Sequence, residues 1–321
     1  MVSVETIGSP LLWVGFITFV LVMLVIDLGV FHRKAHEVSL KEAGIWSAVW
    51  VALAVVFNVG VYAWFGPDRA LEFTTGYLIE KALAVDNIFV FVVIFSTFAV
   101  PPIYQHRVLF WGVLGALAMR AAFIVVGGAF LQRFHWAIYV FGAILAITGV
   151  KLLIQRHQEL HPERNPLVRA FRKLFPVTND FAGDKFTVLR EGKRYATPLL
   201  LALVAVEVTD LIFAVDSIPA IFAITSDPFI VFTSNIFAML GLRSLYFLLA
   251  GVITKFVYLK AGLSVVLVFV GAKMLLMDVY KLPVAASLGI IAGILVTAVV
   301  ASLLRAPTPK KPLSAEGTAH G

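Results

Sequence analysis

Long apolar runs separated by short polar segments make up most of the chain. A helix that crosses a bilayer needs about 20 mainly apolar residues. By this criterion, the pattern predicts an all-α, polytopic membrane protein with nine transmembrane helices. The predicted spans are 10–31, 43–65, 71–98, 107–130, 136–154, 196–223, 229–253, 261–278 and 283–304.

The composition agrees with this class, because 60% of the 321 residues are hydrophobic and only 14% are charged. Soluble domains contain about 25% charged residues. The chain has no cysteine, which excludes disulfides, zinc–thiolate sites and thiol redox chemistry in this chain. The net charge of +7 is better explained by membrane topology than by nucleic-acid binding, so no nucleic-acid partner is expected.

Lysine and arginine are distributed unevenly between alternate loops, and cytoplasmic loops of membrane proteins carry the excess of these residues. With the N-terminus outside, the inside segments hold 19 Lys and Arg and the outside segments hold 3. The pattern therefore predicts an inner-membrane protein with a periplasmic N-terminus and a cytoplasmic C-terminus. The chain is predicted to consist of a transmembrane domain at 1–305 and a disordered cytoplasmic tail at 306–321, because the residues after Arg305 are rich in Pro, Lys and Ser.

The segment 155–195 is the only long loop and is predicted to be cytoplasmic. Within it, residues 165–175 favour a basic amphipathic helix on the inner leaflet. The alternating residues of 185–197, around Glu191 and Gly192, favour a short hairpin. A solvated connector is the simpler interpretation of the loop, and its role stays open.

Two regions of the chain resemble each other. EKALAVDNIF (80–89) is matched by DLIFAVDSIP (210–219), and further matches pair Arg120 with Arg243 and Gly149-Val-Lys151 with Gly271-Ala-Lys273. Spans 3–5 (71–154) and 6–8 (196–278) are thus predicted to be two copies of a three-helix unit. Because three is odd, the copies have opposite orientations, and inverted repeats are typical of transporters with a substrate site between the repeats.

Acidic residues inside spans 3 and 6 are costly, at roughly 2.5–3.5 kcal/mol each in mid-membrane, and usually mark an ion path. The oxygen-bearing side chains here suit hard cations such as Mg²⁺, Ca²⁺ or Mn²⁺, and no histidine lies near them. The candidate metal ligands are Glu80, Asp86, Asn87, Asp210, Asp216 and Ser217.

Helical spacing does not aim all six ligands at one ion. Glu80 shares a helical face with Asn87, whereas Asp86 lies about 120° away. Asp210, Ser217 and Asp216 repeat this arrangement in the second copy. An unwound or kinked segment near Pro219 would bring the acids together.

The charged residues around these ligands are predicted to support the site. Arg120 and Arg243 would orient the carboxylates or replace the cation in the empty site, and Lys81 and Lys273 would extend toward a wet cavity. Glu207 is a candidate third ligand or proton carrier. A purely structural ion-pair network is the alternative. For Asn58 and Asn235, which also lie within spans, polar contacts between helices are expected.

At these residues the sequence resembles the TerC family of membrane proteins, most closely its Alx-type members. The matching stretches are GYLIEKALAVDNIFVF (76–91), YATPLLLALVAVEVTDLIFAVDSIPAIFAIT (195–225) and SNIFAMLGLRSLYFLLAG (234–251). The resemblance implies links to tellurite resistance, alkaline-pH response and manganese export, and a relation to LysE-like exporters. Carried over by match, Glu80, Asp86, Asp210 and Asp216 would be the cation-site acids.

The first hypothesis is therefore an inner-membrane Mn²⁺ exporter that works by alternating access, with Mn²⁺ as its transported ion and no organic cofactor. Protons on the same carboxylates could provide the coupling. A transporter of another solute, such as Ca²⁺ or an amino acid, is the second hypothesis. A membrane scaffold or biogenesis factor is the third, and an enzyme is not expected.

Overall fold

The computed structural model describes residues 6–29, 38–134, 136–154, 170–171, 173, 175–178, 180–190, 192–250, 258–280 and 282–305. The described part is mainly helical and includes one small hairpin. Its elements are α1 (Pro10–Gly29), α2 (Leu40–Phe65), α3 (Pro67–Thr97), α4 (Pro102–Arg133), α5 (Ala137–Ile154), β1 (Thr187–Arg190), β2 (Lys193–Ala196), α7 (Pro198–Phe222), α8 (Pro228–Leu240), α9 (Leu242–Ala250), α10 (Leu259–Leu275) and α11 (Val284–Leu304).

Within the described residues, five helices are long and apolar enough to cross a membrane, namely α2, α4, α5, α7 and α11. The bent pair α8 and α9 makes a sixth if it counts as one span. The other predicted spans coincide with α1, α3 and α10, of which α3 carries six charged residues. The all-α, multi-pass class is therefore confirmed, while the number of nine spans stays a prediction.

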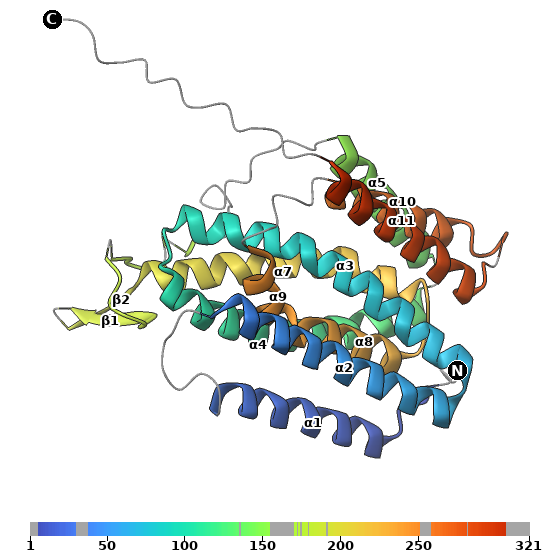
Figure 1. The fold of residues 1–321 in the computed structure, drawn as a ribbon, viewed down its shortest axis with the longest axis horizontal. Helices are drawn as coiled ribbons and strands as arrows, with labels where there is room; N and C mark the ends of the chain where they lie inside the picture. Colours follow the sequence, from blue (N-terminus) through green and yellow to red (C-terminus); the bar gives the residue numbers. More distant parts are fainter. Residues whose placement is uncertain are drawn as a thin grey trace, which may run out of the picture.

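The helices form two groups around α3 (Figure 1). Helices α7, α8 and α9 lie beside α3, α4 packs on α7, α8 and α9, and α2 packs on α3 and α9. Helices α5, α10 and α11 form the second group, in which α5 has its most extensive contact with α10. Every residue of α8 from Phe229 to Leu240 is buried, including the polar Thr233, Ser234 and Asn235.

The turn between α2 and α3 shows how local sequence sets these boundaries. Gly66 has a φ of +86° and its N–H donates to the Tyr62 carbonyl, which closes α2. Pro67 then begins α3, in the first helical position, where its fixed φ and missing N–H cost nothing. The two helices are consequently joined through a single residue.

One predicted span is broken. Residues 229–253 were expected to form one helix, but α8 and α9 meet at Gly241 with a bend of 41°. Of the two expectations near Pro219, unwinding is wrong, because α7 stays helical as far as Phe222, whereas a kink stays a prediction. Pro219 lies in the last turn, so its missing N–H removes one hydrogen bond without ending the helix.

The two predicted repeats pack through matching surfaces. A Cβ on Gly271 of α10 would meet the backbone of α5 at 2.6 Å, at Gly142 O and Ala146 N. A Cβ on Gly149 of α5 would meet Ser264 O of α10 at 2.7 Å. These contacts are reciprocal, because Gly149 matches Gly271 and Gly142 matches Ser264 in the two copies.

The central helices pair in the same reciprocal way. The first helices of the two copies, α3 and α7, contact each other, and each also packs on the second helix of the other copy, α3 on α8 and α7 on α4. A two-fold axis between the copies would produce this pattern. The inverted repeat itself stays a prediction.

The predicted hairpin is present. Strands β1 and β2 pair antiparallel, with Thr187 opposite Ala196 and Arg190 opposite Lys193. Gly192 has a φ of +76°, which glycine adopts at little cost in a tight hairpin turn. Most of the predicted amphipathic helix at 165–175 and the whole tail at 306–321 lie outside the described residues.

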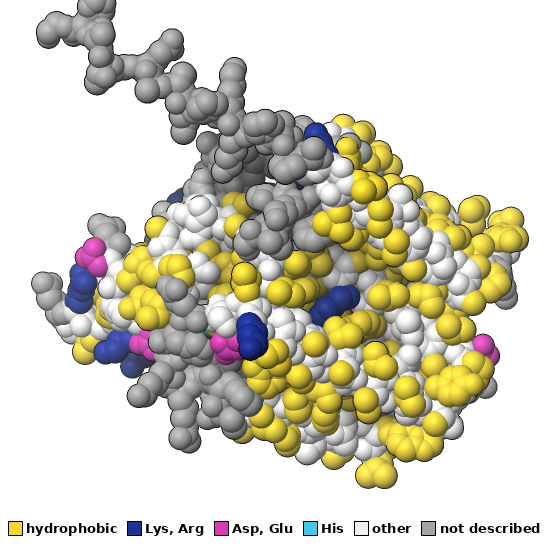
Figure 2. Space-filling model, viewed as in Figure 1, with side chains coloured by type: hydrophobic (Ala, Val, Ile, Leu, Met, Phe, Trp, Pro, Cys, Tyr) yellow, Lys and Arg dark blue, Asp and Glu magenta, His cyan; other side chains and the backbone are white. Residues whose placement is uncertain are grey.

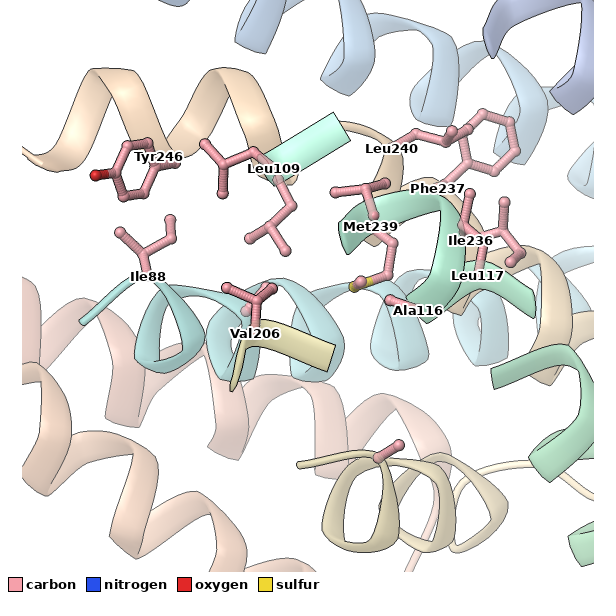
Figure 3. Close-up of a cluster of buried hydrophobic side chains, with 14 of the residues drawn as sticks. Ile88, Leu109, Ala116, Leu117, Val206, Ile236, Phe237, Met239, Leu240 and Tyr246 are labelled. Carbon is pink, nitrogen blue, oxygen red and sulfur yellow. The ribbon is translucent and has the colours of Figure 1, made fainter. Parts of the chain in front are cut away.

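Many large apolar side chains of the helices are exposed, as contact with lipid requires. Figure 2 shows a face covered largely by hydrophobic side chains, and several of its charged side chains gather at the end that carries β1 and β2. Inside, apolar side chains from different helices interlock (Figure 3). Ile88 of α3, Leu109 of α4, Val206 of α7 and Met239 of α8 are each at most 2% exposed.

Candidate functional site

The candidate site is built around Arg120, on α4. This residue is completely buried, at 0% exposure. Its Nε donates to Asp210 Oδ2 at 3.1 Å, and its Nη2 donates to Asp210 Oδ1 at 3.0 Å. The two parallel bonds form the bidentate pairing that a guanidinium makes with a carboxylate, which is among the strongest hydrogen-bonded contacts between side chains.

Glu80, on α3, meets the same guanidinium from another side. Its Oε1 accepts a hydrogen bond from Arg120 Nη1, and the pair is shielded from solvent. In the sequence comparison of the two copies, Glu80 and Asp210 are matching residues. A single arginine from one copy therefore bridges the equivalent carboxylates of both. With all three groups ionised, the cluster has a net charge of −1.

Neutral polar side chains complete this cluster. Asn87 Nδ2 donates to Asp210 Oδ1 at 3.3 Å. Arg120 Nη1 lies 3.4 Å from both Ser217 Oγ and Asn235 Oδ1. The structure thus brings Glu80, Asn87, Asp210 and Ser217 together, as their shared helical faces indicate. Glu80 and Asn87 are seven positions apart in α3, and so are Asp210 and Ser217 in α7. Residues at this spacing share a helical face, so two helices supply all four polar side chains.

The cluster has unused bonding capacity. Among the described residues, Glu80 Oε2, Asn87 Oδ1 and Asn235 Nδ2 are buried and lack a hydrogen-bond partner. A small cavity of about 20 Å³ borders Asn87, Arg120 and Ser217. Buried polar atoms are almost always paired in native proteins, so the unpaired Asn87 oxygen, whose residue borders this cavity, is a candidate ligand atom.

Glu207 lies one turn before Asp210 on α7, and its carboxyl group fits against the α4 backbone at Gly115. A Cβ at Gly115 would come within 2.6 Å of Glu207 Cδ and would collide with Oε1. Glu207 Oε2 is buried and has no hydrogen-bond partner among the described residues. Glycine at position 115 is therefore what makes room for this carboxyl group.

Lys81 points away from the carboxylates toward the break between α8 and α9. Its Nζ donates to Ala238 O at 3.3 Å and lies 5.9 Å from the centre of the Tyr77 ring. A Cβ on Gly241 would lie 2.9 Å from this Nζ. The predicted extension of Lys81 toward a wet cavity is replaced by a contact with the carbonyl end of α8, which carries partial negative charge.

The two remaining basic candidates lie elsewhere. Arg243, on α9, borders a small cavity together with Glu42 and Trp46 of α2. Lys273 is half-buried in α10. The arginines that match in sequence therefore have different surroundings: Arg120 is bonded to the carboxylate cluster, whereas Arg243 borders the cavity at α2.

The second acid of each copy is not placed by the structure. Asp86 lies in α3 and Asp216 in α7, but their side chains are outside what the structure describes. Within the described part of the chain there is no group of three or more His, Cys, Asp or Glu arranged to hold a metal. The assignment of these six residues as metal ligands stays a prediction.

Sequence reasoning placed Asn235 and Asn58 correctly as contacts between helices, since Asn58 Nδ2 donates to Thr74 Oγ1 at 2.8 Å. It did not predict that Asn235 belongs to the arginine cluster. The signal in the sequence was a single amide side chain in a buried, mainly apolar helix.

Sequence reasoning also missed Asp227, a buried carboxylate that accepts from Ile7 N at 2.8 Å and Phe229 N at 2.9 Å. An Asp before Pro228 is a typical helix start.

Comparison with known proteins adds the family. The model of the integral membrane protein TerC family matches residues 65–310. "Uncharacterized membrane protein STKORF319" of Myxococcus xanthus is 60% identical over 311 residues, 96% of this chain and 98% of that protein. "Putative membrane-bound redox modulator Alx" of Escherichia coli (strain K12) is 50% identical over 302 residues, 91% of this chain and 94% of that protein.

A more distant relative is the "Uncharacterized membrane protein" of Rickettsia bellii, which is 41% identical over 293 residues, 91% of this chain and 97% of that protein. No solved structure matches the chain. The family model covers the carboxylates of α3 and α7, the bridging arginine and the broken helix. The chain belongs to the TerC family of integral membrane proteins.

Proposed function

We propose that this protein is a divalent-cation exporter of the inner membrane, with Mn²⁺ as its substrate. The observation that carries the proposal is the meeting of Glu80 and Asp210, from matching positions of α3 and α7, at a buried point between helices of an integral membrane protein. Buried acids at such a position usually serve an ion or proton path.

The donor set fits a hard cation. Glu80, Asp210, Asn87 and Ser217 offer carboxylate, amide and hydroxyl oxygens, which suit Mn²⁺, Mg²⁺ and Ca²⁺. Two carboxylates would neutralise one divalent ion if Arg120 were elsewhere. Asp86 and Asp216, which the same helices carry, are the further candidate ligands. Thiol chemistry does not enter, because the chain has no cysteine.

Alternating access follows from placing the site between the two repeats. In the arrangement seen here, the carboxylates are sealed in the core and paired with Arg120. Relative motion of the repeats would open the contact between α3 and α7 first to one side and then to the other. From the distribution of Lys and Arg, the N-terminus would be periplasmic, and the C-terminus and the loop 155–195 cytoplasmic.

Transport by reconstituted protein tests this proposal. Liposomes loaded with a dye that Mn²⁺ quenches would contain wild-type protein, Asp210→Asn, or the control Asp184→Asn. Asp184 pairs with Arg107 and has a side chain that is 49% exposed, so it provides an acid-to-amide change away from the site. We expect flux in wild type and control and its loss in Asp210→Asn. Absence of flux in folded wild type under either pH gradient would contradict the proposal and favour a scaffold.

The ion is identified by competition. Ca²⁺, Mg²⁺ and a cationic amino acid would be added in excess to the same Mn²⁺ flux assay. We expect Mn²⁺ flux to resist the amino acid, because the described oxygen donors suit a hard metal ion. If the amino acid suppressed Mn²⁺ flux and was itself taken up, the amino acid and not Mn²⁺ would be the substrate.

A further inference from the structure

We propose that Arg120 is a tethered cation that competes with the transported ion, and that it moves from Glu80 and Asp210 to Glu207 when the ion binds. This inference rests on the proposed cation transport. The guanidinium uses both oxygens of Asp210 and one oxygen of Glu80. An ion that coordinates both carboxylates therefore competes with Arg120 for these oxygens.

Electrostatics prevents joint occupancy. A guanidinium and a divalent ion on the same carboxylates would lie within a few ångströms of each other, in a core where charges are poorly screened. Conversely, removal of Arg120 without replacement would leave two buried carboxylates unpaired, which is strongly unfavourable. Exchange of one cation for the other keeps the carboxylates paired in both states, so the empty site does not collapse or fill with water.

Glu207 provides the second position for the guanidinium. It is on α7, one turn before Asp210, and it contacts α4 at Gly115, five residues before Arg120. Five residues span about 7.5 Å along a helix and about 140° around it. The guanidinium would therefore move along the contact between α4 and α7, toward the N-terminus of α4, which is the direction in which helical side chains lean. Glu207 Oε2 lacks a hydrogen-bond partner among the described residues, so it can accept one from the arginine.

The two copies differ at both ends of this proposed switch. The residue that matches Glu207 in the first copy is Tyr77, and Arg243, the match of Arg120, borders the cavity at α2. Among the described contacts, the guanidinium that bridges the carboxylates of both copies is that of Arg120.

Mn²⁺ binding to purified protein tests the competition, measured by the loss of the free Mn²⁺ signal in electron paramagnetic resonance. We expect Arg120→Gln to bind Mn²⁺ at least ten-fold more tightly than wild type. Arg120→Lys, which keeps the charge but loses the bidentate fork, should lie between them and serves if Arg120→Gln does not fold. Arg107→Gln is the control. It removes the ion pair between Arg107 of α4 and Asp184, and the variant should bind Mn²⁺ like wild type. Binding by either Arg120 variant that is no tighter than wild type would overturn the inference.

A double-mutant cycle tests the second position. We expect Glu207→Gln to weaken Mn²⁺ binding several-fold in wild type, because the displaced guanidinium loses its carboxylate, and to have no effect beside Arg120→Gln. An equal effect in both backgrounds would refute the movement to Glu207. If wild type transports Mn²⁺ and the Arg120 variants bind Mn²⁺ with unaltered affinity, only this inference is contradicted. If no variant transports or binds Mn²⁺, the proposed function itself is contradicted.

Discussion

Glu80 and Asp210 are held by one guanidinium, although they belong to different copies of the predicted repeat. The two contacts are unequal, because Asp210 accepts from both Nε and Nη2 of Arg120 whereas Glu80 accepts from Nη1 alone. The arginine is therefore anchored more firmly to α7 than to α3. This asymmetry gives the two carboxylates different roles in stability.

Loss of the Asp210 carboxylate should destabilise the protein more than loss of the Glu80 carboxylate. Breaking a buried ion pair from one side costs about 3–5 kcal/mol. We expect Asp210→Asn to approach this value and Glu80→Gln to cost about 1–2 kcal/mol less, because the fork on Asp210 survives in the latter. Thermal unfolding in detergent provides the comparison. Equal losses, or a larger loss for Glu80→Gln, would show that the fork is not the stronger contact.

Contact between α5 and α10 should depend on glycine at the matched positions. In Gly271→Ala, the new Cβ would meet backbone atoms of α5 at 2.6 Å, and overpacking of this kind costs about 1–3 kcal/mol. Gly293→Ala in α11 is the control, because nothing lies within 4 Å of the position. We expect a lower melting temperature for the first variant and an unchanged or higher one for the second. Tolerance of Gly271→Ala would mean that these helices are farther apart.

Lys81 should stabilise the break between α8 and α9. Lys81→Leu introduces the residue found at the matching position 211 and removes the donor to Ala238 O. Hydrogen bonds from charged groups contribute about 1.5–3 kcal/mol, so we expect faster amide exchange at the C-terminal end of α8. Lys81→Arg should restore protection. If amide exchange in Lys81→Leu were unchanged, Lys81 would not stabilise the break between α8 and α9.

Gly115 should be required for the present position of Glu207. The Cβ of Gly115→Ala would displace the Glu207 carboxyl group, and we expect a destabilisation of about 1–3 kcal/mol. Glu207→Ala removes the colliding atoms, so the double variant should lose less stability than the sum of the single variants. Chemical denaturation of the four proteins gives the coupling energy. Strict additivity would indicate that the two residues do not touch.

Much of this protein follows from its sequence alone. Apolar runs of about 20 residues locate the helices because an unpaired backbone cannot cross a bilayer, and the described helices begin and end close to the predicted spans. The hairpin at 187–196 follows from local alternation and Gly192. The face shared by Glu80 and Asn87 follows from helical geometry, and both side chains reach the cluster.

Tertiary structure decided what local pattern does not contain. Repeat matching treats Arg120 and Arg243 alike, but only packing places Arg120 between α3 and α7 and sets Arg243 beside α2. Sequence likewise suggested unwinding at Pro219, whereas the break is at Gly241, where Trp50 and Lys81 approach the backbone closely. A side chain's partner depends on which helices meet, and that choice depends on contacts between residues far apart in the chain.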